Sequence, residues 1–241
     1  GVAYDDAGEV KLKNIEFNGC SSEENGGALY LKSQRDVDRG EKDFQNILMD
    51  GCDIHHCTAK ENGGAVCVES SHSSTLVNKT LLYNSKVHDN TADKGGGLCV
   101  ESFYVYLADS IITNNKATGK YGGGVYVDSL YDIDLAGAIV IRNNTASNAV
   151  NNLCLQNGTF SSAKMYSGGL EDGAYIGISS TSDSTATVGL NISQYQVGKY
   201  LYADDNGRTF SMTNTKEVAT PLFASVISDN ISLIIIIGGV I

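Results

Sequence analysis

Residues 61–70 read ENGGAVCVES, and close variants of this stretch occur three more times along the chain. The variants are NGGALYLKS at 25–33, GGGLCVES at 95–102 and GGGVYVDS at 122–129. Each copy holds two large aliphatic residues that flank a middle Tyr or Cys. Because side chains alternate between the two faces of a β-strand, we expect the aliphatic residues on one face and the middle residue on the other. The stretch therefore predicts a short strand that follows a glycine turn and that the chain repeats.

A second unit recurs upstream of each glycine turn, and it consists of an apolar residue followed three positions later by Cys or Asn. The Cys or Asn positions are 25 to 37 residues apart, and they are Cys20, Cys57, Asn90, Asn115 and Asn144. A period of this length predicts an array of stacked repeats. We expect the asparagines of the last three copies to stack at a turn and to hydrogen-bond to one another along the axis of the array.

The repeats predict an all-β fold, namely a right-handed parallel β-helix of about five coils over residues 1–158. A single repeat is too short to bury its aliphatic face, whereas stacked repeats form parallel ladders around a continuous interior. We expect residues 159–241 to form a smaller, β-rich segment that caps the last coil and its open sheet edges. The chain has 27 Gly and 13 Tyr but one Pro and no Trp, and this composition favours strands and turns over helices.

The charge and the two ends of the chain limit the class of partner. With 17 Lys and Arg against 28 Asp and Glu, the formal net charge is −11, which argues against nucleic acid or an anionic membrane as the main partner. The start, GVAYDDAGEV, is polar, so any signal peptide has been removed or the sequence starts at a fragment boundary. The stretch SLIIIIGGVI at 232–241 is about half of the ~20 apolar residues that span a bilayer. It is either a buried terminal strand or the first half of a membrane anchor.

The paired glycines also carry a resemblance to a known family. The motif GGA followed by Leu or Val occurs at 26–29 and 63–66, and it alternates with a unit similar to F-x-x-N that begins at Phe17. These repeats resemble those of polymorphic outer-membrane proteins and related right-handed β-helix surface proteins, over about residues 10–158. The resemblance implies an adhesin-like or structural module that is extracellular or displayed at the cell surface. It implies no catalytic residues.

An acidic column is the first candidate site. Stacking would align the residues that directly follow each inward strand, namely Lys32, Glu69, Glu101, Asp128 and Gln156. Three acids in consecutive coils would lie ~5 Å apart and repel one another. Because Ca²⁺ takes several oxygen ligands, Glu69, Glu101 and Asp128 could form a calcium site, and this is the one cofactor that the sequence suggests. The alternative is an exposed turn on which solvent screens the acids.

Histidines and tyrosines form the second candidate surface. His55, His56, His88 and Asp89 fall within two coils and resemble a zinc-binding set, although adjacent His55 and His56 would point to opposite sides of an extended strand. A solvated patch is therefore the favoured interpretation. Tyr30 and Tyr126 occupy the middle position of their strands, where they could stack on sugar rings or support the sheet. The predicted ligand surface consists of Tyr30, Tyr126, His55 and His88.

The favoured function is non-catalytic binding of a glycan or a partner protein, and a rigid stalk is the alternative. A polysaccharide lyase or hydrolase is a third possibility, because parallel β-helices also support such enzymes. An enzyme of this kind needs carboxylates across a cleft and large loops that build a groove. The longest insertions, at 34–43 and 71–79, are short for that task, and the sequence has no nucleophile or phosphate-binding motif. The sequence leaves the oligomeric state open.

Four of the six cysteines fall in pairs from adjacent coils, namely Cys20 with Cys57 and Cys67 with Cys99. Adjacent coils place Cα atoms within disulfide range, but in-register side chains keep the Cβ atoms slightly beyond the preferred ~3.8 Å. Free, stacked thiols are the favoured expectation and disulfides the alternative. Cys52 and Cys154 are expected to be small apolar fillers.

Overall fold

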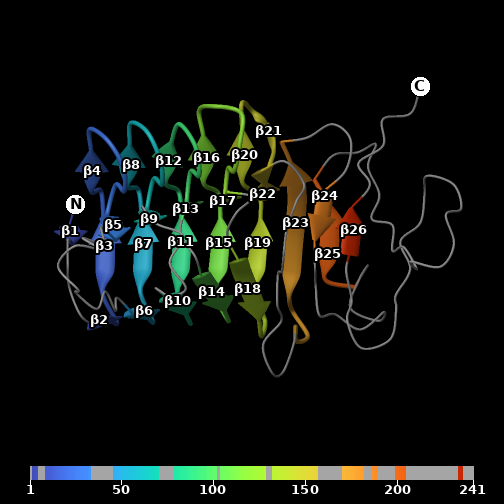
Figure 1. Ribbon diagram of the computed structural model, residues 1–241, viewed down its shortest axis with the longest axis horizontal. Coiled ribbons are helices and arrows are strands. Elements are labelled where there is room, and N and C mark those ends of the chain that lie inside the picture. The colour runs from blue at the N-terminus through green and yellow to red at the C-terminus, as the bar shows by residue number, and fades with distance from the viewer. Residues whose placement is uncertain are drawn as a thin grey trace, which may run out of the picture.

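The protein is described here from a computed structural model. The structure describes residues 2–4, 9–33, 46–70, 79–101, 104–128, 132–156, 170–181, 186–188, 199–204 and 233–235. The described residues form short strands joined by turns, and the strands stack into a parallel β-solenoid (Figure 1). This confirms the all-β solenoid fold that the repeats predict.

Five sets of strands follow one another along the axis of the solenoid. The first two sets contain β2 (Glu9–Lys13), β3 (Glu16–Asn18), β4 (Ser21–Ser22), β5 (Leu29–Ser33), β6 (Asn46–Asp50), β7 (Asp53–His55), β8 (Thr58–Ala59) and β9 (Val66–Ser70). The next two contain β10 (Lys79–Tyr83), β11 (Lys86–His88), β12 (Thr91–Ala92), β13 (Leu98–Glu101), β14 (Tyr104–Ala108), β15 (Ile111–Thr113), β16 (Lys116–Ala117) and β17 (Val125–Val127). The fifth contains β18 (Asp132–Ala136), β19 (Val140–Arg142), β20 (Thr145–Ala146), β21 (Ala149–Val150) and β22 (Leu153–Leu155). Parallel pairing in four steps joins the five sets, so the solenoid makes about four turns.

Equivalent strands of successive sets pair in parallel and in register. One row, in the order β2, β6, β10, β14 and β18, forms a five-stranded sheet, and a second row that runs from β4 to β20 pairs with β21 to form a six-stranded sheet. The rows that begin with β3 and β5 belong to one larger sheet, in which β1 (Val2–Tyr4) lies beside β5. Figure 1 shows the row of β3, β7, β11, β15 and β19 side by side across the solenoid.

Aliphatic side chains from three rows fill the interior. The row that begins with β2 aligns Leu12, Met49, Leu82, Leu107 and Leu135, and the last four of these are at most 2% exposed. In the β5 row, the two residues that flank each middle Tyr or Cys point inward, as the alternation predicts. Each fully buried aliphatic side chain contributes about 1.5–3 kcal/mol, so stacking supplies the stability that a single repeat lacks.

Left-handed backbone at fixed positions lets the chain turn between strands. Two residues separate β7 from β8, and the first of them, His56, has φ +55°. The equivalent positions of the other sets are also left-handed, with φ values from +55° to +65°, and they are Gly19, Asp89, Asn114 and Asn143. Gly, Asn, Asp and His are the residues that most readily adopt this conformation. The turn before the repeated strand needs glycine itself, because a Cβ on Gly63 would lie 2.3 Å from the carbonyl oxygen of Val66.

Buried asparagines stack beside these turns and hydrogen-bond along the axis. Asn90 Nδ2 donates to Asn115 Oδ1 over 2.9 Å, and Asn115 Nδ2 donates to Asn144 Oδ1 over 3.0 Å. The same oxygens accept from the backbone N–H of the preceding asparagine. All three side chains are at most 1% exposed, so in the dry interior the column supplies hydrogen-bond partners to the backbone groups of the turns. This asparagine ladder confirms the stacking that the sequence predicts.

A longer strand closes the C-terminal end of the solenoid. This strand, β23 (Tyr175–Ser180), pairs with β19 through its first residues and with β22 through its last, so it joins two rows into one sheet. A further strand, β25 (Leu201–Ala203), pairs with the outer edge of β23. The predicted C-terminal β-rich segment therefore contains strands that cover the last coil, as Figure 1 shows.

The apolar C-terminal stretch contributes one short described strand. Leu233–Ile235 form β26, which pairs antiparallel with β24 (Ala186–Val188). The rest of 232–241 lies outside the described residues, so the anchor hypothesis stays a prediction. In the part of the chain that the structure describes, no helix has the length and apolar character to cross a membrane.

Candidate binding surface

The first three residues of the acidic column are in register, and the carboxylates of Glu69 and Glu101 have polar partners. Glu69 lies in register between Lys32 and Glu101. Its carboxylate accepts hydrogen bonds from Tyr30 Oη over 2.5 Å and from Asn25 Nδ2 over 3.1 Å, and Lys32 Nζ lies 3.7 Å away. The column is therefore a row of compensated charges.

Lys94 supplies the compensation for the next acid along the column. Its Nζ lies 2.9 Å from Glu101 Oε1 and 4.5 Å from the ring centre of Tyr126. Burial lowers the pKa of Lys94, but the hydrogen bond to Glu101 and the nearby negative charges, including that of Asp128, outweigh it and raise the pKa overall. Lys94 thus stays charged and offsets the repulsion between the acids.

Calcium binding by Glu69, Glu101 and Asp128 stays a prediction. Among the residues that the structure describes, no three His, Cys, Asp or Glu side chains are arranged so that they could hold a metal ion. Calcium would have to displace Lys94 and Tyr30 from the carboxylates, because a hard cation binds through the same oxygens. Calorimetric titration with Ca²⁺, on the wild type and on Glu101→Gln, tests the prediction directly.

The middle column of the repeated strand is buried, and this corrects the expectation that it faces solvent. Cys67, Cys99, Tyr126 and Cys154 form a second apolar cluster, and each is at most 3% exposed. The glycine turns lie close to two residues of this column, because a Cβ on Gly122 would lie 2.5 Å from Tyr126 Cβ and a Cβ on Gly95 would lie 2.9 Å from Cys99 Cβ. Tyr126 also donates a hydrogen bond to Gln156 Oε1. Its ring is therefore unavailable to a sugar, and Tyr30, which is half-buried, is the more accessible of the two tyrosines.

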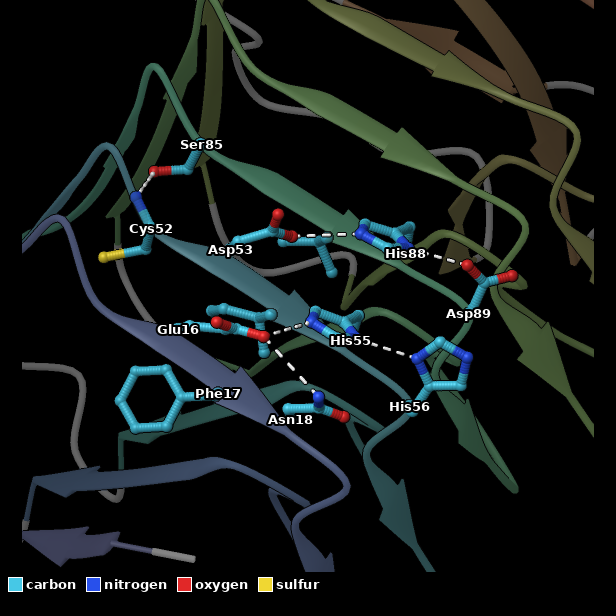
Figure 2. A network of polar contacts seen from close by, with 12 residues as sticks. Glu16, Phe17, Asn18, Cys52, Asp53, His55, His56, Ser85, His88 and Asp89 are labelled. Atoms are coloured by element: carbon cyan, nitrogen blue, oxygen red, sulfur yellow. Dashed lines mark hydrogen bonds and ion pairs between the residues drawn. The ribbon is translucent and has the colours of Figure 1, made fainter.

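The predicted histidine set lies together on the row of β3, β7 and β11. His55 and His88 are in register on β7 and β11, and their rings stack with centres 4.9 Å apart and planes 5° from parallel. Each imidazole reaches back by one set to a carboxylate. His55 Nε2 lies 3.1 Å from Glu16 Oε1, and His88 Nε2 lies 3.0 Å from Asp53 Oδ1. Figure 2 shows these pairs side by side on neighbouring strands.

The left-handed turn brings the next residue of each set back onto the imidazole. His55 Nδ1 lies 2.7 Å from His56 Nδ1, and His88 Nδ1 lies 2.6 Å from Asp89 Oδ2 (Figure 2). In an extended strand, as the sequence analysis expects, His55 and His56 would point to opposite sides. That expectation is wrong because His56 has φ +55° and so lies beyond the end of the strand.

We call the side chains of Glu16, Asp53, His55, His56, His88 and Asp89 the histidine surface. The His55 side chain is 14% exposed and that of Glu16 is 63% exposed, and His56 is exposed as well. Sequence reasoning missed Glu16 and Asp53, which stand two positions before Asn18 and His55. Residues two apart on a strand share a face, and that spacing is the signal that could have found them. Its imidazoles and carboxylates contact one another through four polar contacts, and among the described residues no group of three His, Cys, Asp or Glu is arranged to hold a metal ion.

The six cysteines are free thiols in the structure. The hydrogen bond with Cys99 raises the pKa of the Cys67 thiol, and burial raises it further. Burial raises the pKa of Cys57 to about 11 and that of Cys154 to about 12. Thiols with such pKa values remain protonated near neutral pH and react slowly, so these cysteines act as packing residues.

No family model, no curated protein and no solved structure matches this chain in comparisons with known proteins.

Proposed function

We propose that the protein is a non-catalytic, adhesin-like module, secreted or displayed at the cell surface, that binds a glycan or a partner protein through the histidine surface. The observation that carries the proposal is the convergence of six polar side chains from consecutive sets on one side of the solenoid, partly exposed and already oriented by mutual hydrogen bonds. Strands and fixed turns hold these groups, so little side-chain entropy is lost when a partner binds.

The chemistry of the histidine surface suits a partner rich in hydroxyl or amide groups. Carboxylates of Glu16, Asp53 and Asp89 accept hydrogen bonds, and imidazoles both donate and accept. Equivalent groups on neighbouring parallel strands repeat at ~4.8 Å, so an elongated partner could bridge two sets. The net charge of −11 makes a polyanionic partner unfavourable.

A small pocket inside the solenoid offers no group for glycan hydrolysis. Aliphatic side chains such as Met49, Val66 and Leu82 line it, and it contains no ionisable carboxylate or imidazole. The polar groups of the histidine surface instead lie on the outside of a strand row, where they are partly exposed to solvent. Hydrolysis of a glycan would need two carboxylates across a substrate site, one of them with a raised pKa.

The test is binding of the purified protein to a broad glycan array and to immobilised surface-protein fractions, each run with Ca²⁺ and with chelator. Wild type is compared with the double variant His55→Ala/His88→Ala. Thr113→Ala is the matched control, because Thr113 occupies the same column one set further along and lies outside the histidine surface. Binding that the double variant loses and the control keeps supports the proposal. If the double variant and the control both keep binding, the binding site lies elsewhere on the protein. Absence of binding under all conditions favours a structural stalk.

A further inference from the structure

The first set of strands leaves one end of the solenoid without covering strands. On one side, β2, β3 and β4 each pair with a strand of the second set, and among the described residues no strand pairs with them on the other side. The fourth row is covered at this end, because β1 lies beside β5. We call the outer side of β2, β3 and β4 the open end. Unpaired edge strands of this kind present backbone N–H and C=O groups to which another strand can bind.

Apolar side chains reach the surface at the open end. Four apolar residues of the first set are only partly buried and pack against the interior cluster, namely Leu12, Ile15, Phe17 and Cys20. The residues that occupy the same columns in the second set are at most 2% exposed, and they are Met49, Cys52, Ile54 and Cys57. Exposed apolar side chains beside unpaired strand edges favour association with another protein surface.

The opposite end of the solenoid has covering strands. β21 pairs with β20, and β23 pairs with both β19 and β22, so three of the four rows end in a covering strand. Figure 1 shows β23 at the other end of the molecule from β2, β3 and β4. This difference disfavours a head-to-tail filament, in which an open end would stack on the covered end of the next copy. Contact between two open ends, in contrast, is complete after two copies.

Two open ends also match in shape. One turn of the solenoid rises by one strand spacing, about 4.8 Å, so the end is a ramp that runs from β1 through β2 and β3 to β4. The ramp has its step between β4 and β1. A two-fold axis perpendicular to the solenoid relates two ramps of the same hand, so their surfaces stay parallel. The two steps coincide when the axis passes through the step and through the opposite corner, between β2 and β3.

We propose that the open end is a dimerisation surface, at which a second copy of this chain docks open end to open end around this two-fold axis. In this arrangement β2 of each copy lies antiparallel to β3 of the other. The exposed charges are complementary across the contact, because β2 carries Lys11 and Lys13 and β3 carries Glu16. Lys13 and Glu16 each have a partner within their own copy, but their side chains are 72% and 63% exposed and can reach a second one.

Analytical ultracentrifugation of the full chain over a wide range of concentration tests dimerisation. We expect the wild type to reach twice the monomer mass, and a monomer at every concentration overturns the proposal. Phe17→Glu places a charge within the contact and should give a monomer. Ile111→Glu is the matched control, because Ile111 is 40% exposed on β15 of the same row but lies away from the open end. This control should remain a dimer, and a dimer that survives Phe17→Glu overturns the proposal.

Charge reversal tests how the two copies are arranged. In Lys11→Glu/Lys13→Glu, an acidic β2 faces the acidic β3 of an identical copy, and in Glu16→Lys a basic β3 faces a basic β2. Each variant alone should dimerise at least ~10-fold more weakly than the wild type. An equimolar mixture of the two should regain the wild-type affinity, because both contacts of the mixed dimer join opposite charges. A mixture that dimerises as weakly as its components overturns the proposal.

Cross-linking of the wild type covers the case in which a variant does not fold. Unlabelled and isotope-labelled chains are mixed and treated with a carbodiimide, which joins amines to carboxylates in direct contact. We expect cross-linked peptides of mixed label in which Lys11 or Lys13 is joined to Glu16. A dimer whose mixed-label cross-links all lie elsewhere overturns the proposal.

Discussion

Removal of one rung from the asparagine ladder should cost far more stability than a change of Asn to Ala at the surface. Asn115 is the central rung, and its side chain is 1% exposed. Its Nδ2 donates to Val87 O, Thr113 O and Asn144 Oδ1, and its Oδ1 accepts from both nitrogens of Asn90. Two amide hydrogens shared among three acceptors, together with the two bonds accepted, amount to about four hydrogen bonds. At ~1 kcal/mol each, with a buried N–H of Asn90 left without its acceptor, Asn115→Ala should lower the free energy of unfolding by roughly 3–5 kcal/mol.

The measurement is urea unfolding at pH 7 followed by circular dichroism, together with hydrogen exchange at the Asn90 amide. Exchange is included because a stacked array need not unfold in two states. Asn18→Ala is the matched control, since Asn18 is exposed and should change stability by less than about 0.5 kcal/mol. Asn115→Cys should give an intermediate loss, because Cys57 occupies the same column and its thiol donates to His55 O over 3.3 Å. A loss below ~1 kcal/mol in Asn115→Ala would show that the ladder is not a source of stability.

Three further changes test the turns, the acidic column and the thiols. Asn114 has φ +57°, so Asn114→Ala should lower the free energy of unfolding by about 1–2 kcal/mol, whereas Asn114→Gly should leave the thermal unfolding midpoint nearly unchanged. Equal midpoints for the two variants would contradict this prediction. Lys94→Met should lower the free energy of unfolding by about 1–2 kcal/mol, because it removes the contacts of Lys94 with Glu101 and with the Tyr126 ring. The destabilisation should be smaller when Glu101 is already replaced by Gln. If the effects of the two substitutions simply add, Lys94 and Glu101 do not stabilise each other. Thiol titration of the denatured, unreduced protein should find six reactive groups, and two fewer would indicate a disulfide such as Cys67 to Cys99.

The solenoid could be predicted because its interior repeats simple residue patterns. Alternating aliphatic residues such as Val66 and Val68 specify the inward strand, and the spacing of Asn90, Asn115 and Asn144 specifies the stack. These features depend on local periodicity and on contacts between equivalent positions of adjacent sets. Both are visible in a single sequence.

The errors arose where the backbone leaves the extended conformation. The strand rule placed Cys67, Cys99 and Tyr126 outside, but these side chains belong to a second buried cluster, against which Tyr30 and Tyr121 pack. The same rule separated His55 from His56, although His56 occupies a left-handed turn position. The equivalent residues Gly19, Asp89, Asn114 and Asn143 are a recognisable signal for that conformation.

Contacts between distant segments could not be predicted in the same way. Asp204 follows Asn152 by more than fifty residues, and no repeat relates the two positions. The hydrogen bonds that Asn152 donates to Asp204 depend on where β25 runs beside β23. A repeat pattern contains no information about that path.

The connections between successive strands differ in how much their length varies from one set to the next. Two residues lie between β3 and β4 and between each equivalent pair in the later sets. From one set to the next, the sequence between β5 and β6 comprises residues 34–45, whereas the sequence between β13 and β14 comprises residues 102–103 alone. The two-residue turns fix the register of the strands, so connections of very different length are tolerated between one set and the next. A foreign epitope inserted between Glu101 and Tyr104 should therefore be displayed beside the acidic column without shifting any strand, and repeated insertions would form a row along one ridge of the molecule.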